Sequence, residues 1–341
     1  MKSKSVIETI ILCVLAFLVI FNSEKSKAGA LNAIGLCRDI IIPSLLPIII
    51  ISNSITISKC SLVVEKLFGS LISKIFHLPK SAATPIILGA VGGYPTGAIL
   101  TKELYESGCI EQEDAKRIMR FNINPGIAFT ITAIGLVYLK SIKLGFIIYL
   151  ICTISSFIAG AVEGIFYKNK KYYYKADTQR LDLSYAVVRS VEVATKSILI
   201  MCVYIILFSA ILNIFGIKKE YIPLFEITSG IFGYGKAIPL EYLCFFLSFS
   251  GICIHLQINA ITRAFDMKYY DLFLSRVIVA SISYFPGKVY TLLCPQEAEV
   301  FSNISNAIPK ASSVNYGLSL VLLFGCIIII LDLKNKKSKL I

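Results

Sequence analysis

Gly89-Ala-Val-Gly-Gly-Tyr-Pro-Thr-Gly-Ala98 places four glycines and a proline inside an otherwise apolar stretch of the chain. Glycine and proline weaken a helix by about 1 and 3 kcal/mol per residue. Broken backbone at membrane depth is tolerated only where protein buries it or where it lines a watery cavity. The stretch therefore predicts a break in a membrane-embedded segment and a candidate substrate site, with these binding residues: Gly92, Gly93, Tyr94, Pro95, Thr96 and Gly97.

The composition around this stretch is that of a polytopic membrane protein. Of 341 residues, 56% are hydrophobic and 16% are charged, whereas soluble domains carry about 25% charged residues, and the mean hydropathy is +0.76. We expect an all-α fold with about eight transmembrane helices of about 20 residues each. The expected spans are 6–22, 39–57, 122–140, 144–167, 197–216, 240–262, 271–289 and 314–333.

The formal net charge of +13 does not indicate a nucleic-acid partner. The lysines gather at the ends of apolar segments, as the positive-inside rule expects. The clusters at 168–175 and 334–339 are interpreted as cytoplasmic anchors that touch anionic headgroups. The expected partner is therefore the lipid bilayer. The charge pattern does not decide whether the chain forms a homo-oligomer.

Motifs for catalysis are missing from the sequence. It contains no H-E-x-x-H, no G-x-S-x-G and no Walker loop, and its ten cysteines have no metal-binding or redox spacing. We therefore expect no enzyme activity, no cofactor and no metal site. Transport by such a chain would be ion-coupled, passive or powered by a partner.

A second interrupted segment, 221–239, contains Pro223, Gly230, Gly233, Gly235 and Pro239. Both interrupted segments, 81–100 and 221–239, are interpreted as re-entrant hairpins. The order span, hairpin, span, span then occurs twice with an odd number of spans per unit, so the second unit is inverted. Paired broken segments in inverted repeats are typical of secondary transporters.

This symmetry predicts five parts of the chain. They are an N-terminal transmembrane segment (1–34), a first repeat (35–167), a basic cytoplasmic loop (168–183), a second, inverted repeat (184–289), and an extracytoplasmic loop with a last span and basic tail (290–341). Ala28-Gly-Ala30 resembles a signal-peptide cleavage site, but its distance from the apolar run favours an uncleaved first span. The segments 61–78 and 184–197 predict amphipathic helices in the interface plane, and 111–121 predicts a short, solvent-facing helix.

Each hairpin is followed by a second interruption that carries polar side chains. These residues are Asn122, Asn124, Pro125 and Gly126 in the first unit, and Ser250, Gly251, His255 and Gln257 in the second. A half-helix that starts inside the membrane points unpaired N–H groups and a partial positive charge at a cavity, which favours an anion. The alternative is a glycine-lined helix crossing without a ligand.

Three ionisable side chains inside apolar segments are further candidates. Glu226, followed by Thr228 and Ser229, could bind a coupling cation or proton, or cap a half-helix. His255 could titrate during transport or serve as a hydrogen-bonded core histidine. Arg276 could pair with a substrate carboxylate, although snorkelling to the inner surface is the favoured interpretation.

The strings Leu88-Gly-Ala-Val-Gly-Gly-Tyr-Pro-Thr-Gly-Ala98 and Leu104-Tyr-Glu-Ser-Gly108 resemble the first-half signature of the YlbJ (SpoVV) family of sporulation integral membrane proteins. The segments 122–126, 226–230 and 249–251, with Gln257 and Arg276, fit the same family. The resemblance covers roughly 35–290. It implies a nucleoside-recognition Gate domain and movement of dipicolinic acid from the mother cell towards the forespore, at the outer forespore membrane.

Three functions follow for testing. The first is a transporter for a small organic anion, with dipicolinate implied by the resemblance. The second is a nucleoside or nucleobase carrier on the same scaffold, because Asn, Gln and Glu side chains also suit neutral polar ligands. The third is a non-transporting scaffold for sporulation membrane complexes.

Overall fold

The computed structural model describes residues 3–167, 180–234 and 238–294, and within these residues the fold is all helical. The one pairing of strand type among them is an isolated bridge between Ser58 and Leu181. The helices, in chain order, are α1 (Ser3–Phe21), α2 (Ser23–Leu36), η1 (Cys37–Ile41), α3 (Ile42–Ile57), α4 (Ser61–Phe76), η2 (Lys80–Ala82), α5 (Ala83–Gly92), α6 (Thr96–Glu106), α7 (Gln112–Phe121), η3 (Phe129–Tyr138), α8 (Ile142–Ile165), α9 (Leu183–Phe215), α10 (Ile222–Phe225), α11 (Ile227–Gly233), α12 (Leu240–Phe249), α13 (Gly251–Thr262), η4 (Arg263–Phe265) and α14 (Tyr269–Leu293).

Five helical stretches of the described chain are long and apolar enough to cross a membrane. They are Ser23–Ile57, Ile142–Ile165, Leu183–Phe215, Leu240–Phe265 and Tyr269–Leu293. Their outer faces are apolar: Leu199, Val203 and Leu207 follow one another at helical spacing on α9 and are 55%, 61% and 49% exposed. Such a stripe suits contact with lipid.

The expected count of about eight spans is not reached in the described residues, for three reasons. The predicted span 6–22 corresponds to α1, whose apolar part, Thr9–Phe21, is short. In the predicted span 122–140 the first five residues are not helical, as the predicted interruption requires, and the helical part that follows, mostly the π-helix η3, is short. The predicted span 314–333 lies outside the described residues, as do 168–179 of the basic loop and 295–313 of the expected outer loop.

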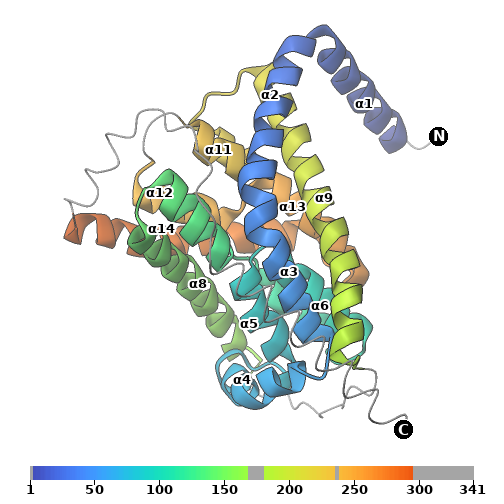
Figure 1. Cartoon of the computed structure of the whole chain (residues 1–341), viewed down its shortest axis with the longest axis vertical. Coiled ribbons are helices and arrows are strands. Elements are labelled where there is room, and N and C mark those ends of the chain that lie inside the picture. The colour runs from blue at the N-terminus through green and yellow to red at the C-terminus, as the bar shows by residue number, and fades with distance from the viewer. Residues whose placement is uncertain (1–2, 168–179, 235–237, 295–341) are drawn as a thin grey trace.

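The longest helical pair forms one side of the molecule. Figure 1 shows α2 and α3 as one long rod beside α9, with α4 across its lower end. The rod is continuous through the π-turn η1, which precedes Pro43; a proline removes a backbone donor and such bulges accommodate it. A Cβ on Gly29 would lie 2.5 Å from the backbone oxygen of Ser209, so Ala28-Gly-Ala30 serves as a close crossing of α2 with α9.

Two of the expected surface helices differ from the structure. The segment 184–197 is not a separate interfacial helix, because it is the first part of the 33-residue helix α9. Helix α7 does form near 111–121 but is not solvent-facing throughout: Arg117 is 2% exposed and donates to the backbone oxygens of Phe76 and His77. These bonds join α7 to the end of α4, which forms separately as expected for 61–78.

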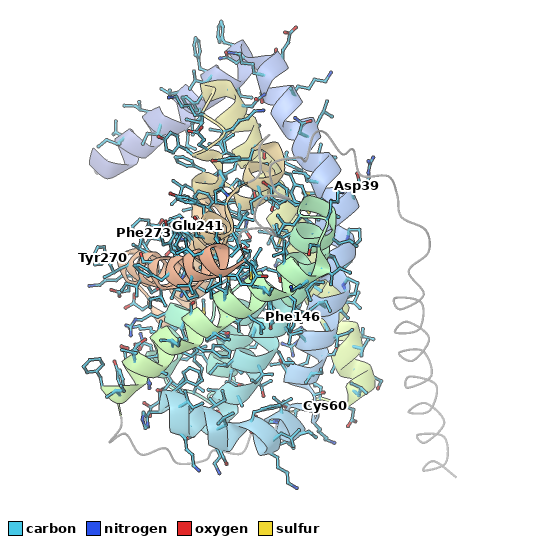
Figure 2. All side chains as sticks on the ribbon, turned by 90° about the vertical axis from the view of Figure 1, so that its left-hand side faces the viewer. Asp39, Cys60, Phe146, Glu241, Tyr270 and Phe273 are labelled. Atoms are coloured by element: carbon cyan, nitrogen blue, oxygen red, sulfur yellow. The ribbon has the colours of Figure 1, made fainter. Side chains whose placement is uncertain are left out.

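Helices α8, α12 and α14 pack together on the other side of the molecule. Figure 2 places Glu241, Tyr270 and Phe273 in one band at mid-height. Glu241, at the start of α12, is buried and accepts hydrogen bonds from Lys288 (2.9 Å) and Thr291 (2.9 Å) of α14. The two long sides enclose the interrupted helices, which are described next.

Candidate functional site

The first interruption is a helical hairpin that turns at Gly93, Tyr94 and Pro95. Gly93 has φ +77°, and a Cβ on it would lie 2.2 Å from the backbone nitrogen of Gly126. Only glycine combines this left-handed backbone with so close an approach. The Tyr94 amide donates to the backbone oxygen of Asn124 over 2.8 Å. The hairpin predicted at 81–100 is therefore present as α5 and α6, and its tip is joined to the non-helical segment 122–126.

Asn122 holds the two arms of this hairpin. Its side-chain amide donates to the backbone oxygen of Pro85 over 2.7 Å. A Cβ on Gly89 or on Gly97 would lie 2.7 or 2.9 Å from the Asn122 Nδ2. The two glycines thus leave the space that the asparagine side chain fills. Asn122 is 1% exposed and acts here as a structural link between helices.

The non-helical segment after α7 is stabilised by a buried arginine. Arg276 of α14 is fully buried, and it donates to the backbone oxygens of Ile123 (2.7 Å) and Arg120. These carbonyls have lost their helical partners because the chain leaves the helix at Asn122. The favoured expectation that Arg276 snorkels to the inner surface is therefore wrong, and both terminal nitrogens bond to backbone rather than pointing into a cavity.

The second interruption turns at Glu226 and not at the later glycines of 221–239. Gly230 lies inside α11, where a Cβ would be 2.5 Å from the backbone nitrogen of Pro223. The hairpin is therefore made of α10 and α11, inside the predicted range 221–239, and its turn is at Glu226. Within 234–239, residues 235–237 lie outside the description.

The tip of this second hairpin rests on the break between α12 and α13. Ser250 and Gly251 have φ +76° and +72°. A Cβ on Gly251 would lie 3.2 Å from the backbone oxygen of Phe225. The second half thus repeats the contact of the first half, in which a hairpin tip lies against a broken backbone.

His255 and Gln257 follow this break on α13, and their side chains bond within their own helix and the break. The His255 Nε2 is 2.6 Å from the backbone oxygen of Phe249, at the end of α12. The Gln257 amide donates to the Sγ of Cys253 over 3.5 Å. Neither side chain lines a cavity in this conformation, so a role in binding stays a prediction for both.

The two interruptions meet at one buried cavity of about 20 Å³. Four of the predicted binding residues line it: Tyr94, Gly126, Glu226 and Thr228. The other lining residues are apolar: Ile41, Leu45, Phe129, Met201, Ile205 and Ile254. A cavity of this size holds about one water molecule. The sequence patterns did not indicate the apolar lining, because residues on five separate helical elements contribute it.

The remaining predicted residues lie around this cavity without lining it. Pro95 precedes α6 and accepts from the Ala98 amide over 3.0 Å. Gly92 and Thr96 face each other across the turn, since a Cβ on Gly92 would be 2.8 Å from Thr96. Asn124 and Pro125 form part of the non-helical segment. The structure therefore separates residues at the cavity from residues that shape the turns behind it.

The electrostatics of the second hairpin tip differ from the expectation of free half-helix N–H groups. The Glu226 Oε1 accepts from the Thr228 amide (2.9 Å), and its Oε2 accepts from the Ser229 amide (2.6 Å) and the Ser229 hydroxyl. Glu226 is 1% exposed. The N–H groups that begin α11 are thus occupied by this carboxylate.

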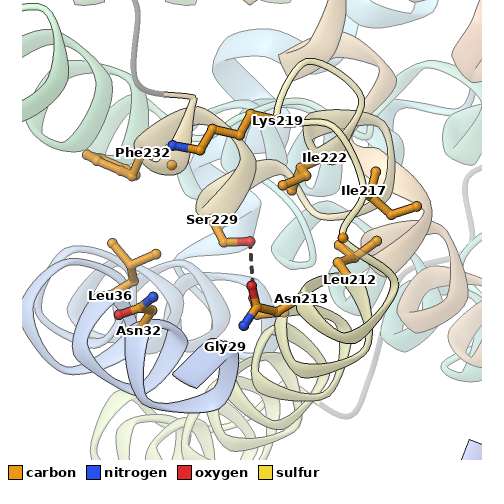
Figure 3. Close-up of a pocket in the computed structure, with 13 residues that line it drawn as sticks. Gly29, Asn32, Leu36, Leu212, Asn213, Ile217, Lys219, Ile222, Ser229 and Phe232 are labelled. Atoms are coloured by element: carbon orange, nitrogen blue, oxygen red, sulfur yellow. Dashed lines mark hydrogen bonds between the residues drawn. The ribbon is translucent and has the colours of Figure 1, made fainter. Parts of the chain in front are cut away.

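A larger opening lies above the second hairpin, and we call it the vestibule. It has a volume of about 500 Å³, and its walls come from α2, the end of α9 and the α10–α11 hairpin. Figure 3 shows Asn32, Asn213, Lys219 and Ser229 among the residues around it. Sequence reasoning missed Gly29, Asn32, Asn213 and Lys219. One sequence signal could have indicated Lys219: the predicted topology places it on the outer side of the membrane, where the positive-inside rule makes lysines unexpected.

A second opening of about 240 Å³ lies at the opposite end of the molecule. It is lined by Thr56, Glu103, Glu106 and Arg189, among others. Burial raises the pKa of Glu103 to about 7, and its Oε2 has no hydrogen-bond partner in the structure. The glutamate is therefore a group that changes charge near neutral pH in the last turn of α6.

Comparison with known proteins gives one distant likeness. Over 130 residues the chain is 24% identical to the sporulation integral membrane protein YlbJ of Bacillus subtilis (strain 168). The match covers 38% of this chain and 32% of that relative, so it spans about a third of the relative's length. No protein family matches the chain, and no solved structure does.

Taken together with the five apolar helices, this likeness establishes one property. The protein is an integral membrane protein. Its distant relative is a sporulation membrane protein, which agrees with the family that the sequence resembles.

Proposed function

We propose that this protein transports a small organic anion across the membrane, with dipicolinate as the first candidate. The observation that carries the proposal is the central cavity, where two interrupted helices from separate halves of the chain meet. Irregular backbone at membrane depth typically marks the site of a transporter. Tyr94, Glu226 and Thr228 supply the polar groups of this cavity, and apolar side chains close it.

The two halves support an arrangement as inverted repeats. In the first half, the α5–α6 hairpin is followed by α7 and then by the break at 122–126. In the second half, the α10–α11 hairpin is followed by α12 and then by the break at Ser250 and Gly251. Each hairpin tip lies against the break that follows it. In such transporters the substrate lies between the two repeats.

The small volume of the central cavity supports the interpretation of this conformation as a closed state. A space of about 20 Å³ holds about one water, and small-molecule sites commonly measure about 300–1,000 Å³. The vestibule, at about 500 Å³, has the size for a small aromatic dianion, and Lys219 on its wall supplies a positive charge. Entry from the vestibule to the central cavity requires the α10–α11 hairpin to move.

Dipicolinate is the candidate because the resemblance at 88–108 implies it. The distant relative in Bacillus subtilis, a sporulation integral membrane protein of the same name, agrees with that resemblance. The nucleoside carrier remains the second candidate, since Asn32 and Asn213 in the vestibule are neutral donors and acceptors that suit a nucleobase.

Uptake of labelled dipicolinate into vesicles that contain only this protein tests the proposal. Tyr94→Phe removes a buried hydroxyl at the central cavity that has no hydrogen-bond partner in the structure. We expect it to lower uptake about tenfold with an unchanged melting temperature, because a hydrogen bond to a charged group contributes about 1.5–3 kcal/mol. The matched control is Tyr105→Phe, which lies against Phe265 away from the cavity and should transport normally.

Three results would contradict this proposal in different ways. Inhibition of uptake by nucleosides, with no inhibition by unlabelled dipicolinate, would favour the nucleoside carrier. Absence of any uptake by a correctly folded protein would contradict the proposed transport function. Normal spore formation in cells whose chain carries both Tyr94→Phe and Thr228→Val, combined with loss of sporulation on deletion, would favour a scaffold.

A further inference from the structure

Glu226 is a buried carboxylate whose hydrogen-bond partners are all uncharged. It accepts from two backbone amides and from the Ser229 hydroxyl. Across residues 3–167, 180–234 and 238–294, no lysine, arginine or histidine forms an ion pair with it. A carboxylate buried without a cation is costly when charged and is commonly neutralised by a proton.

The titratable groups that face Glu226 come from four elements. They are Tyr94 at the first hairpin tip, Cys37 of η1, its hydrogen-bonded neighbour Cys202 of α9, and Cys253 of α13. None of these groups is cationic in any protonation state. The charge on Glu226 is therefore not balanced by the elements packed around it.

Two hydroxyl groups connect this carboxylate to the vestibule. Ser229 is half-buried and lines the vestibule wall, as Figure 3 shows. Ser209 of α9 also lines the vestibule. The Ser209 hydroxyl lies 3.0 Å from the Ser229 hydroxyl, which donates in turn to the Glu226 Oε2. Hydroxyls both donate and accept and can rotate, so this pair can carry hydrogen bonds in either direction.

We propose that Glu226 is a proton-binding site which is loaded from the vestibule through Ser229 and Ser209, so that a proton and the substrate anion cross the membrane together. This inference rests on the proposed transport function. A hydronium ion in the vestibule gives a proton to the Ser209 oxygen, the Ser209 hydroxyl proton passes to the Ser229 oxygen, and the Ser229 hydroxyl proton passes to the Glu226 Oε2. The hydronium ion is left as water, and Glu226 becomes a neutral acid.

The coupling follows from charge. Glu226 lines the same cavity as Tyr94 and Gly126, so an ionised Glu226 would repel an anion entering there. Repulsion between like charges at about 4 Å amounts to several kcal/mol at an effective dielectric constant of about 20. Protonation removes the repulsion, and it also frees the amides of Thr228 and Ser229 to bind the anion.

A proton suits this site better than a metal ion. The oxygens of Glu226 already face N–H and O–H donors, and donors repel a cation. No three His, Cys, Asp or Glu side chains of the described chain are grouped so as to hold a metal. A sodium or calcium ion would also need several more oxygen ligands than a cavity of about 20 Å³ provides.

The test uses the full chain in vesicles, with the membrane potential clamped at zero and an acidic exterior. With one proton per anion, a gradient of about one pH unit should concentrate labelled dipicolinate about tenfold inside the vesicles. A pH dye in the lumen should report acidification that begins on adding dipicolinate. Glu226→Gln should abolish both signals. The matched control, Glu103→Gln, removes a different carboxylate that titrates near neutral pH and should keep both.

Ser209→Ala tests the path as distinct from the binding site. It removes one hydroxyl of the vestibule pair and leaves the Glu226 carboxylate in place. We expect several-fold slower uptake at alkaline external pH, where protons are scarce, and a normal rate at acidic pH. A rate that falls equally at every pH would contradict a role of Ser209 in proton transfer.

The outcomes separate this inference from the proposed function. Exchange of labelled for unlabelled dipicolinate without any gradient tests transport alone. If exchange occurs but accumulation ignores the pH gradient, or if Glu103→Gln rather than Glu226→Gln removes the response, the inference is wrong and transport stands. If exchange is absent, the infrared band of a protonated carboxyl group remains as a readout. Because Glu103 also titrates near neutral pH, the band is compared in Glu103→Gln and in the double variant Glu103→Gln/Glu226→Gln. A pH-dependent band that the double variant loses would support the proton site, and a band that persists in the double variant would overturn it.

Discussion

The two helix interruptions share a geometry but differ in what holds them. The first is stabilised by a close backbone contact between Gly93 and Gly126 and by two side chains that do not change charge near neutral pH, the Asn122 amide and the Arg276 guanidinium. The second is held by an ionisable carboxylate, Glu226, and two hydroxyls, and it borders a vestibule of about 500 Å³. We expect from this comparison that the first half is a rigid frame, whereas the proposed proton site lies in the half that borders the vestibule.

The largest effect is expected at the tip of the rigid half. Gly93→Ala should lower the free energy of unfolding by about 4 kcal/mol, because the left-handed backbone costs about 1–2 kcal/mol and overpacking against Gly126 adds about 1–3 kcal/mol. The measurement is thermal unfolding in detergent. Gly216→Ala is the control: Gly216 has φ +57° but no atom within 4 Å of its Cβ position, so it should lose only about 1 kcal/mol. Equal losses would show that the contact with Gly126 is unimportant.

Arg276→Met should destabilise the same half by about 3 kcal/mol. Methionine keeps much of the volume but leaves the backbone oxygens of Ile123 and Arg120 without a donor, and each lost bond to a charged group is worth about 1.5–3 kcal/mol. Arg276→Lys should recover part of the loss. The same unfolding measurement applies, with the exposed Arg263→Met as the control. If Arg276→Met is as stable as the wild type and only transport is lost, Arg276 would have a role in substrate binding and not in stabilising the fold.

Ser250→Gly should act in the opposite direction in the second half. Ser250 has φ +76°, which costs a residue with a Cβ about 1–2 kcal/mol. Glycine removes this strain, so we expect the melting temperature to rise by about 2–4 °C. Ser248→Gly, two residues earlier inside α12, should instead lower it, because glycine weakens a helix interior. A fall in both variants would mean that the Ser250 side chain stabilises the break.

The smallest effect is expected from Glu103, in the last turn of α6 in the first half. Its pKa is about 7 in the folded protein and 4.5 for the ordinary group, so the folded state binds the proton more tightly. The free energy of unfolding therefore falls as pH rises from 4.5 to about 7, and the loss is complete above that range. Glu103→Gln should raise the melting temperature by about 2 °C at alkaline pH and leave it unchanged at about pH 4.

The exposed neighbour Glu106, which pairs with Lys102 at 3.5 Å, provides the control for this pH test. Glu106→Gln should show no such dependence on pH. If Glu103→Gln stabilises the protein equally at both pH values, the burial of its charge is not the cause. The rigid half would then be insensitive to pH throughout, which sharpens its contrast with Glu226.

The positions of the interruptions could be predicted from the sequence because helix breakers act locally. The glycines and Pro95 of 89–98 and the Asn-x-Asn-Pro-Gly string at 122–126 mark breaks that the structure contains. The second hairpin was placed less well. Its turn lies at Glu226, since Gly230 packs within a helix against Pro223, and a glycine that permits close packing has the same sequence signal as one that ends a helix.

The roles of the polar residues could not be predicted in the same way. Arg276 and Ile123 are 153 residues apart in the chain, and no local pattern reveals that one bonds to the other. No sequence pattern indicated the vestibule either, because its wall is formed by three separate parts of the chain: α2, α9 and the second hairpin. The segment 184–197 is helical as predicted, but it forms the first part of a longer helix and not a separate one.

The sequence by itself determined the membrane class and the places where helices break, since hydrophobicity and backbone propensity are properties of short segments. The tertiary structure alone decided which polar groups are bonded to broken backbone and which face a cavity. The reason is that a buried polar group must find its hydrogen-bond partner in space, and for Asn122, Glu226 and Arg276 the packing of the helices determines what lies within reach.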